Sequence, residues 1–432
     1  MNFDLSRTDD LTRRQLITKI AHSVLGVSVL PLLDRVGFAA DPKPAAKGTS
    51  AARGKAQKIV YLMMNGAQSQ LDTWDPKPKS KYQGDTKTIQ TKISGVQFGE
   101  HFKSLAGIAD KLAVIHSLET TTADHQQARY LLETSYKMIA TTKHPGMGSW
   151  VQKSLGRIHK QLPPVVHVGE GQGPGYLGAA FAPVPIGDPA KGLQNTKSPD
   201  YLKNEMFDKR MKLSESFDSA FRAKAKNAKV NGYDDLYREA ISLLRSQDLK
   251  AFDISTEPQE QKDAYGTTRF GQGCLLARKL IENDVRYVQV SLGGWDMHNE
   301  IFDNMPKLAS ELDKVVAALI NDLQKRGLLD STLVVLATEF GRTPKISSTT
   351  GRDHHPAAFS AMLCGGGIKG GQVYGKSDDD AFYVVEGNMK PNDLNATIAK
   401  ALNIPFDKEI HSPDGRPFTL ANGGKPVDKL LS

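Results

Sequence analysis

Six short apolar runs, rich in Val, Ile and Leu, constrain this chain more than any other feature; they cover 58–64, 111–118, 164–169, 285–292, 332–338 and 357–364. They do not alternate strictly between apolar and polar residues, which is typical of strands covered on both faces. Apolar residues three and four apart predict helices over 272–283 and 307–326. The repeated order of strand, helix and strand predicts an α/β sandwich with a mostly parallel sheet. Residues 204–264 are polar and helix-favouring, so we expect a helical excursion there.

The composition narrows the class of protein. The chain has 432 residues, of which 39% are hydrophobic and 24% charged. These values exclude a wholly disordered chain, a fibre and a polytopic membrane protein. Two cysteines, Cys274 and Cys364, exclude a disulfide scaffold and a four-cysteine zinc module, and leave one disulfide open.

The first forty residues have the features of an export signal. Arg13 and Arg14 precede a modest apolar run over 20–33, and small residues follow at 37–40. This pattern predicts a twin-arginine signal over 1–40, a flexible linker over 41–57 and a folded domain over 58–432. The apolar run is too short and too polar to span a bilayer, so we expect no transmembrane span in the mature chain. The translocase is then a partner during export, and the periplasm or cell envelope is the expected location.

The positive charge is not spread over the predicted core. The net charge is +8, yet residues 41–58 hold five basic and one acidic side chain, and 201–230 hold eight basic and four acidic ones. A nucleic-acid-binding protein would carry a basic face on its folded core. We therefore expect no nucleic-acid partner.

Candidate site residues follow the apolar runs, at the strand ends where ligands bind in open α/β sheets. Carboxylates and imidazoles gathered there suit a divalent ion such as Zn²⁺, Mn²⁺ or Ca²⁺, and arginines suit an anionic substrate. The candidates are Asn65 and Asp72, then Thr122, His125 and Arg129, then Asp296 and His298, then Glu339, Arg342, His354 and His355.

Several candidates also have a purely structural interpretation. Asp72 could cap a turn, and Arg342 could neutralise Glu339 as an ion pair. The glycine-rich segment 169–175 follows a strand but contains Pro174, so it predicts a loop beside the site and no dinucleotide-binding turn.

The chain resembles a known family over nearly all of its mature length, on the stretches 64–78, 270–299, 328–343 and 351–371. It is similar to the exported bacterial proteins of domain of unknown function 1501, in the alkaline phosphatase/sulfatase superfamily. The resemblance implies a three-layer α/β/α sandwich with a metal site at the strand ends.

The resemblance also assigns metal ligands to positions of this chain. Asp296 and His298 match an aspartate and a histidine after a late strand, and His354 matches a final histidine, with His355 as its substitute. Glu339, Phe340 and Gly341 stand where the family pattern has Asp-His-Gly, so the carboxylate is kept and one histidine is absent. Asp72 is the nearest match to the aspartate of the first strand.

The nucleophile departs from the pattern of the superfamily. Residues 124–135 correspond to the sulfatase signature but contain no cysteine, which excludes formylglycine chemistry. The nearby hydroxyls are those of 120–122, of which Thr122 is our candidate.

The leading hypothesis is an exported, metal-dependent hydrolase of a phosphate or sulfate ester, or of another small or polymeric anionic substrate. His125 would act as general base or leaving-group acid, and Arg129, Arg342 and Asn65 would bind the substrate. The alternative is a non-catalytic envelope binding protein that keeps the fold and one structural ion. A weaker third hypothesis is a scaffold that contacts anionic envelope polymer through 201–230.

Overall fold

The computed structural model describes residues 56–194, 240–244 and 246–432, with isolated positions at 206, 209, 212, 213 and 216. The predicted export signal, nearly all of the linker and most of the helical excursion lie outside the described residues.

The centre of the fold is an eight-stranded sheet in the order β12-β4-β11-β8-β1-β7-β5-β6. Its strands are β12 (Gln372–Tyr374), β4 (Leu112–Leu118), β11 (Phe359–Gly365), β8 (Thr332–Thr338), β1 (Lys58–Met64), β7 (Tyr287–Leu292), β5 (Val165–Val168) and β6 (Val184–Ile186). Each of the six predicted strands is present, with ends shifted by no more than two residues. The predicted mostly parallel α/β sheet is confirmed.

Strand β1 shows why a central strand of this sheet has a continuous apolar sequence. All seven of its residues are buried. Val60, Leu62 and Met64 face one apolar core, whereas Ile59, Tyr61 and Met63 face the other. Since successive strand side chains point to opposite faces, a strand between two helical layers is apolar along its centre, and only its first residue here, Lys58, is charged and pairs with Asp284.

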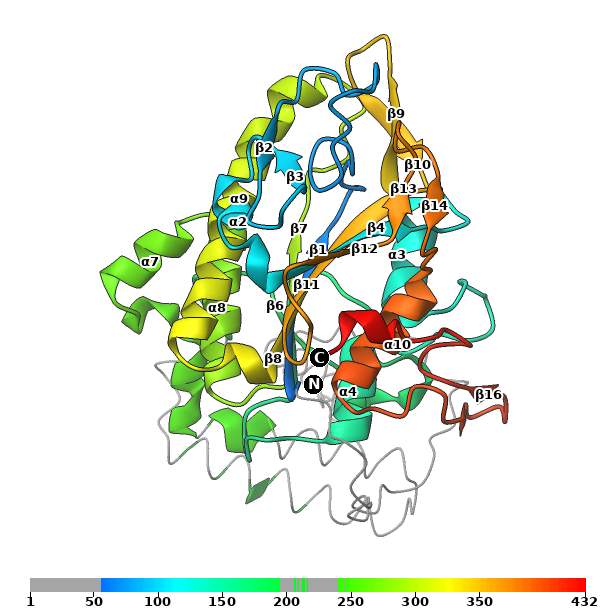
Figure 1. The fold of residues 1–432 in the computed structure, drawn as a ribbon. Coiled ribbons are helices and arrows are strands. Elements are labelled where there is room, and N and C mark those ends of the chain that lie inside the picture. The colour runs from blue at the N-terminus through cyan, green and yellow to red at the C-terminus, as the bar shows by residue number, and fades with distance from the viewer. Residues whose placement is uncertain are drawn as a thin grey trace, which may run out of the picture.

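Helices cover both faces of the sheet, as the predicted three-layer sandwich requires (Figure 1). The core on one side includes residues of α8 (Arg269–Glu282) and α9 (Ile301–Lys325). The core on the other side includes residues of α3 (His125–Thr134), α4 (Met147–Leu155) and α10 (Pro391–Ala401).

The remaining elements are short. Among the elements whose bounds the structure describes, the other helices are α2 (Lys103–Ala106) and α7 (Gln259–Tyr265), with 3₁₀ turns at Ala109–Lys111, Gly175–Leu177, Ala179–Phe181, Gln247–Phe252, Ile254–Thr256, Leu329–Ser331 and Asp428–Leu430. Two-stranded sheets pair β2 (Thr88–Gln90) with β3 (Gln97–Gly99), β9 (Gly341–Ile346) with β10 (Arg352–His355), β13 (Lys376–Ser377) with β14 (Val384–Glu386), and β15 (Ile410–His411) with β16 (Pro417–Phe418).

Strand β11 is antiparallel to both of its neighbours, β4 and β8. The chain leaves β8, forms the β9–β10 hairpin and enters β11 without an intervening helix. A parallel strand would need a crossover to the other end of the sheet, so this direct return must be antiparallel. The return keeps the β9–β10 hairpin at the carboxyl end of β8, at the top of Figure 1.

Two further observations concern covalent links and membranes. Cys274 and Cys364 are both buried and free, so the disulfide that the sequence left open is absent.

No described helix is both long and apolar enough to cross a bilayer.

Helix α3 carries a buried carboxyl group to the sheet. Glu133 is 4% exposed, and one of its oxygens accepts a hydrogen bond from Gln289 of β7 at 2.5 Å. Burial raises the pKa of Glu133 to about 7, against opposing contributions from Gln289 and Arg129. The carboxyl group therefore holds its proton over a pH range in which the unfolded chain loses it.

Replacing Glu133 by Gln should remove a pH-dependent loss of stability. A raised folded pKa means that the wild-type contribution is complete below about pH 4.5 and declines until about pH 7. The advantage of Glu133→Gln in free energy of unfolding should grow by about 2 kcal/mol between pH 5 and pH 8. Denaturant unfolding at both values measures it, with the exposed Glu260→Gln as control. An advantage independent of pH would contradict the assignment.

Candidate metal centre

The candidate centre forms where the loops after two strands meet the β9–β10 hairpin. The loop after β4 leads into α3 and His125, the loop after β7 carries Asp296 and His298, and the hairpin carries His354. These segments lie far apart in the sequence, and the sheet order brings them to one edge.

Local features position the loop after β4 and the loop after β7. Asp124 caps α3, its carboxylate accepting from the backbone N–H of Gln127 at 2.9 Å, so that His125 is the first residue of the helix. Gly66, with φ +112°, permits the loop after β1 to lie against the loop after β7. A Cβ at that position would be 2.5 Å from the backbone nitrogen of Asp296.

Three imidazole nitrogens and one carboxylate oxygen converge. His354 Nε2 lies 3.0 Å from His125 Nε2 and 3.0 Å from His298 Nε2. Asp296 Oδ1 lies 2.9 Å from His298 Nε2, 3.2 Å from His354 Nε2 and 3.4 Å from His125 Nε2. The side chains are one-quarter to one-half exposed, so the group is open to solvent.

The other nitrogen of each ring faces an acceptor. His354 Nδ1 lies 2.7 Å from the backbone oxygen of Ala123. His125 Nδ1 lies 2.7 Å from Glu339 Oε1, and His298 Nδ1 lies 2.9 Å from Asp353 Oδ1. These acceptors place the ring protons on Nδ1, so neutral rings point Nε2 lone pairs at one another and at Asp296. This arrangement is unfavourable without a cation between the rings.

The geometry fits a divalent metal. Histidine ligated through Nε2, with Nδ1–H donated to a carboxylate or carbonyl, is a recurrent arrangement at metal sites. Tetrahedral zinc with bonds of about 2.0–2.1 Å places neighbouring ligand atoms about 3.3 Å apart. The measured separations are close to this value. His125, Asp296 and His354 form a three-residue group whose ligand atoms all lie within 4.8 Å of one another.

Arg342 holds Asp296 in place from the buried side of the cluster. The guanidinium is fully buried, donates to Asp296 Oδ1, and also donates to the backbone oxygens of Gly66, Ala67 and Arg352. Partial burial would raise the pKa of Asp296, but hydrogen bonding and attraction to Arg342 hold it well below its usual value. Arg342 therefore holds the candidate ligand Asp296 and is not exposed to solvent, and its partner is Asp296 where the sequence suggested Glu339.

Glu339 and Phe340 hold rings in place. Glu339 is 2% exposed and accepts from the Gly66 backbone N–H at 2.8 Å as well as facing His125. Its hydrogen bond to His125 is the largest cause that raises the pKa of that ring, against partial burial. The Phe340 ring lies 4.9 Å from the rings of both His125 and His354. Phe340, which stands where the family pattern has a histidine, thus packs against two histidines of the cluster.

The structure places Asp72 outside the cluster. Its carboxylate is fully buried and pairs with buried Arg352, with Nε 2.7 Å from Oδ2. Ser69 and Thr86 also donate to it. Arg352 in turn donates to the backbone oxygens of Tyr82 and Gln83 at 3.0 and 3.1 Å. The pair joins the loop after β1 to the start of β10.

Four other candidates lie at or beyond the edge of the cluster. His355 Nε2 lies 2.5 Å from the backbone oxygen of Phe382, away from His354. Arg129 pairs with Glu170 at 2.5 Å. The Thr122 hydroxyl accepts from the Asp124 backbone N–H at 3.3 Å. The side-chain oxygen of Asn65 is buried without a hydrogen-bond partner among the described residues.

Sequence reasoning did not select Asp353, which orients His298. The available signal was its place directly before the only pair of adjacent histidines in the chain. Gly351 was another unused signal, because a Cβ there would lie 1.9 Å from the backbone oxygen of His298. The glycine allows this end of the hairpin to lie against the loop after β7.

Replacing Asp72 by Asn should lower stability without changing how much metal the candidate centre binds. The change leaves buried Arg352 without its counter-charge, which costs about 3 kcal/mol. Thermal unfolding should show the loss, while the metal-to-protein ratio of the folded variant stays at the wild-type value. A stable Asp72→Asn variant that had lost its metal would restore Asp72 as a ligand.

Comparisons with solved structures give remote likenesses. The chain is similar to the lipoteichoic acid synthase LtaP from Listeria monocytogenes, at 12% identity over 94% of this chain and 81% of that chain, with a TM-score of 0.40. It is similar to the PsFucS1 sulfatase from Pseudoalteromonas sp., at 12% identity over 87% and 74%, with a TM-score of 0.37. The phosphonate monoester hydrolase SpPMH from Silicibacter pomeroyi gives 12% identity over 86% and 78%, with a TM-score of 0.34. TM-scores this low carry no conclusion about activity.

Sequence comparisons identify the family. No curated protein matches the chain. The family model described as protein of unknown function (DUF1501) matches residues 56–431. This match covers almost the whole described chain, and the protein belongs to the DUF1501 family.

Proposed function

We propose that this protein is an exported, metal-dependent hydrolase of a phosphate or sulfate ester or of another anionic substrate. The observation that carries the proposal is the convergence of three histidine Nε2 atoms on Asp296 Oδ1, each ring held through Nδ1. Export is proposed on the paired arginines and the apolar run of the first forty residues.

His125, Asp296 and His354 are the proposed metal ligands. Imidazole and carboxylate donors favour Zn²⁺ or Mn²⁺ over Ca²⁺, which prefers oxygen ligands. Such an ion, when bound, polarises an ester oxygen and lowers the pKa of a bound water. Three protein ligands leave a position open, as catalytic sites require. His125 thereby changes its proposed role from general base to ligand.

His298 is the proposed general base. Its side chain is 40% exposed, and Asp353 holds its Nδ1–H, so Nε2 carries the lone pair that accepts a proton from an attacking water. Arg342 Nη1 lies 3.4 Å from the same nitrogen. Water is the proposed nucleophile because the Thr122 hydroxyl is engaged at the start of α3 and no cysteine lies there.

Arg129 is the proposed contact for an anionic substrate. It lies on α3, one turn beyond His125, and its ion-pair partner Glu170 is 71% exposed. An exposed ion pair is weak, so a phosphate or sulfate group can exchange with Glu170 at little cost.

A non-catalytic binding protein with a structural ion is the second candidate. His298 Nε2 is closer to Asp296 Oδ1 than the Nε2 atoms of His125 and His354, and a fourth ligand would close a tetrahedral shell. The two candidates therefore differ in the role of His298.

Replacing His298 by Ala separates the two functions. For a hydrolase, the variant should keep its metal while turnover of 4-nitrophenyl phosphate or sulfate falls about 100-fold or more. His354→Ala should lose the metal and the turnover together. Metal content is measured by mass spectrometry after exhaustive dialysis. Loss of metal from His298→Ala, with no ester hydrolysed by the wild type, would favour the binding protein.

His355→Ala is the matched control, because it removes the neighbouring imidazole, which faces Phe382. It should keep both metal and turnover. Asp353→Asn should keep the metal and lower turnover about 10-fold or more, because Asn cannot stabilise a protonated His298 as Asp does. Normal turnover in Asp353→Asn would contradict the proposed role of the His298–Asp353 pair.

A further inference from the structure

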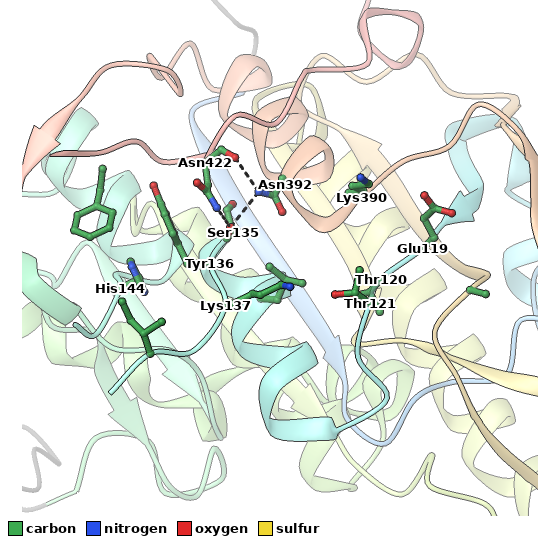
Figure 2. A pocket seen from close by; sticks show the side chains of 14 residues that line it. Glu119, Thr120, Thr121, Ser135, Tyr136, Lys137, His144, Lys390, Asn392 and Asn422 are labelled. Carbon is green, nitrogen blue, oxygen red and sulfur yellow. Dashed lines mark hydrogen bonds between the residues drawn. The ribbon is translucent and has the colours of Figure 1, made fainter. Parts of the chain in front are cut away.

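A cavity of about 700 Å³ lies apart from the candidate metal centre, between α3 and the segments around α10 (Figure 2). We call it the α3–α10 groove. It is lined by Glu119, Thr120, Thr121, Leu131, Ser135, Tyr136, Lys137, Ile139, His144, Ala357, Lys390, Asn392, Phe418 and Asn422. None of these residues belongs to the centre, and the volume suits a ligand of drug-like size.

One end of the groove is aromatic. Figure 2 shows Tyr136 beside His144 at this end, opposite the end formed by Glu119, Thr120 and Thr121. The rings of Tyr136 and His144 stack at 4.1 Å and 2°, and Phe418 lies edge-on to both. Ile139, which is 42% exposed, adds an aliphatic surface that is only partly covered. An apolar ring or chain would bury this surface.

His144 supplies a hydrogen-bond donor without a partner. The Tyr130 hydroxyl accepts from the His144 backbone N–H at 2.7 Å and lies 2.8 Å from His144 Nδ1, to which it can donate. That donation places the ring proton on Nε2, which is buried and has no partner. Burial lowers the pKa of His144 to about 4, so the ring is neutral near pH 7. A buried donor of this kind lacks an acceptor.

The rim of the groove carries excess positive charge. Lys137 and Lys390 are exposed, and neither ammonium pairs with any residue that the structure describes. Glu119 is the one carboxylate of the lining, and it accepts from Asn388 at 3.2 Å. Asn392 and Asn422 donate to backbone oxygens, including that of Ser135, and so build the wall.

We infer that the α3–α10 groove binds a small organic acid with an apolar body. The body packs against Ile139, Leu131 and Phe418. An oxygen of the ligand accepts from His144 Nε2, and the acidic group lies near Lys137 and Lys390. Binding at this groove needs no metal and does not depend on the proposed hydrolase.

The test uses the mature chain, from residue 41 onward, with a chelator present throughout. The probe is 8-anilinonaphthalene-1-sulfonate, an apolar acid whose fluorescence rises on binding. We expect one saturable site with the same affinity in wild type and His354→Ala. Its uncharged analogue, N-phenyl-1-naphthylamine, should bind at least about fivefold more weakly.

Surface variants locate the site without disturbing the fold. Lys137→Gln combined with Lys390→Gln should weaken binding of the sulfonate about fivefold and leave the uncharged analogue unaffected. Lys307→Gln with Lys314→Gln makes the same change of charge on α9, across the sheet, and should have no effect. Ile139→Ser should weaken both probes.

A spectroscopic readout tests the buried donor. In a chain labelled with ¹⁵N-histidine, the Nε2 resonance of His144, assigned with His144→Gln, should shift on addition of the sulfonate. Equal weakening by the two double lysine variants, several unsaturable sites, or an unchanged His144 resonance at saturation would each overturn the inference.

Discussion

The candidate centre depends on one oxygen atom, Oδ1 of Asp296. Three imidazole Nε2 atoms lie within 3.4 Å of it, and the guanidinium of Arg342 donates to it from the buried side. A single carboxylate oxygen cannot satisfy three rings whose protons are held elsewhere. The group therefore requires either extra protons or a cation on its exposed side. A divalent ion meets that requirement with ligand separations of the right size.

The surrounding fold keeps these atoms together through buried charge. Arg342 and Arg352 are fully buried, and both use their side chains to join loops that follow different strands. Arg342 ties Asp296 to the loop after β1, and Arg352 ties the start of β10 to Asp72. Removing one partner of a buried pair leaves an uncompensated charge, so moving these loops apart costs several kcal/mol of free energy. These buried arginines therefore hold the loops of the centre together.

The sequence predicted the sheet well because burial on both faces leaves a local signature. Every residue of β1 and β8 is buried, and both strands have the predicted bounds. The direction of β11 was not readable from its composition. It follows from the lack of a helix between β8 and β11, a feature of the connection and not of the strand.

The site was predicted in part, because a sequence gives the position of a residue at a strand end but not the direction of its side chain. His125, Asp296, His298 and His354 were selected and do meet. Asp72 was selected on the same grounds, yet it faces inward to Arg352. His354 and His355 are neighbours on β10, and successive strand residues point to opposite faces, so only one could join the cluster. The buried state of Arg342 depends on three carbonyls from two distant segments, the loop after β1 and the start of β10, which no local pattern encodes.

The loop between β4 and α3 links the candidate centre to the α3–α10 groove. Thr120 and Thr121 line the α3–α10 groove. Two residues after Thr121, the backbone oxygen of Ala123 faces Nδ1 of His354 and orients its ring. Thr120 is itself joined to Pro356 by a backbone hydrogen bond of 2.8 Å, next to Ala357 of the groove wall. The segments that present two proposed ligands, His125 and His354, thus also form one side of the groove. A ligand that filled the groove would contact the same short loop that sets the direction of the His354 ring. The groove and the centre have separate chemistry, but they share this piece of backbone.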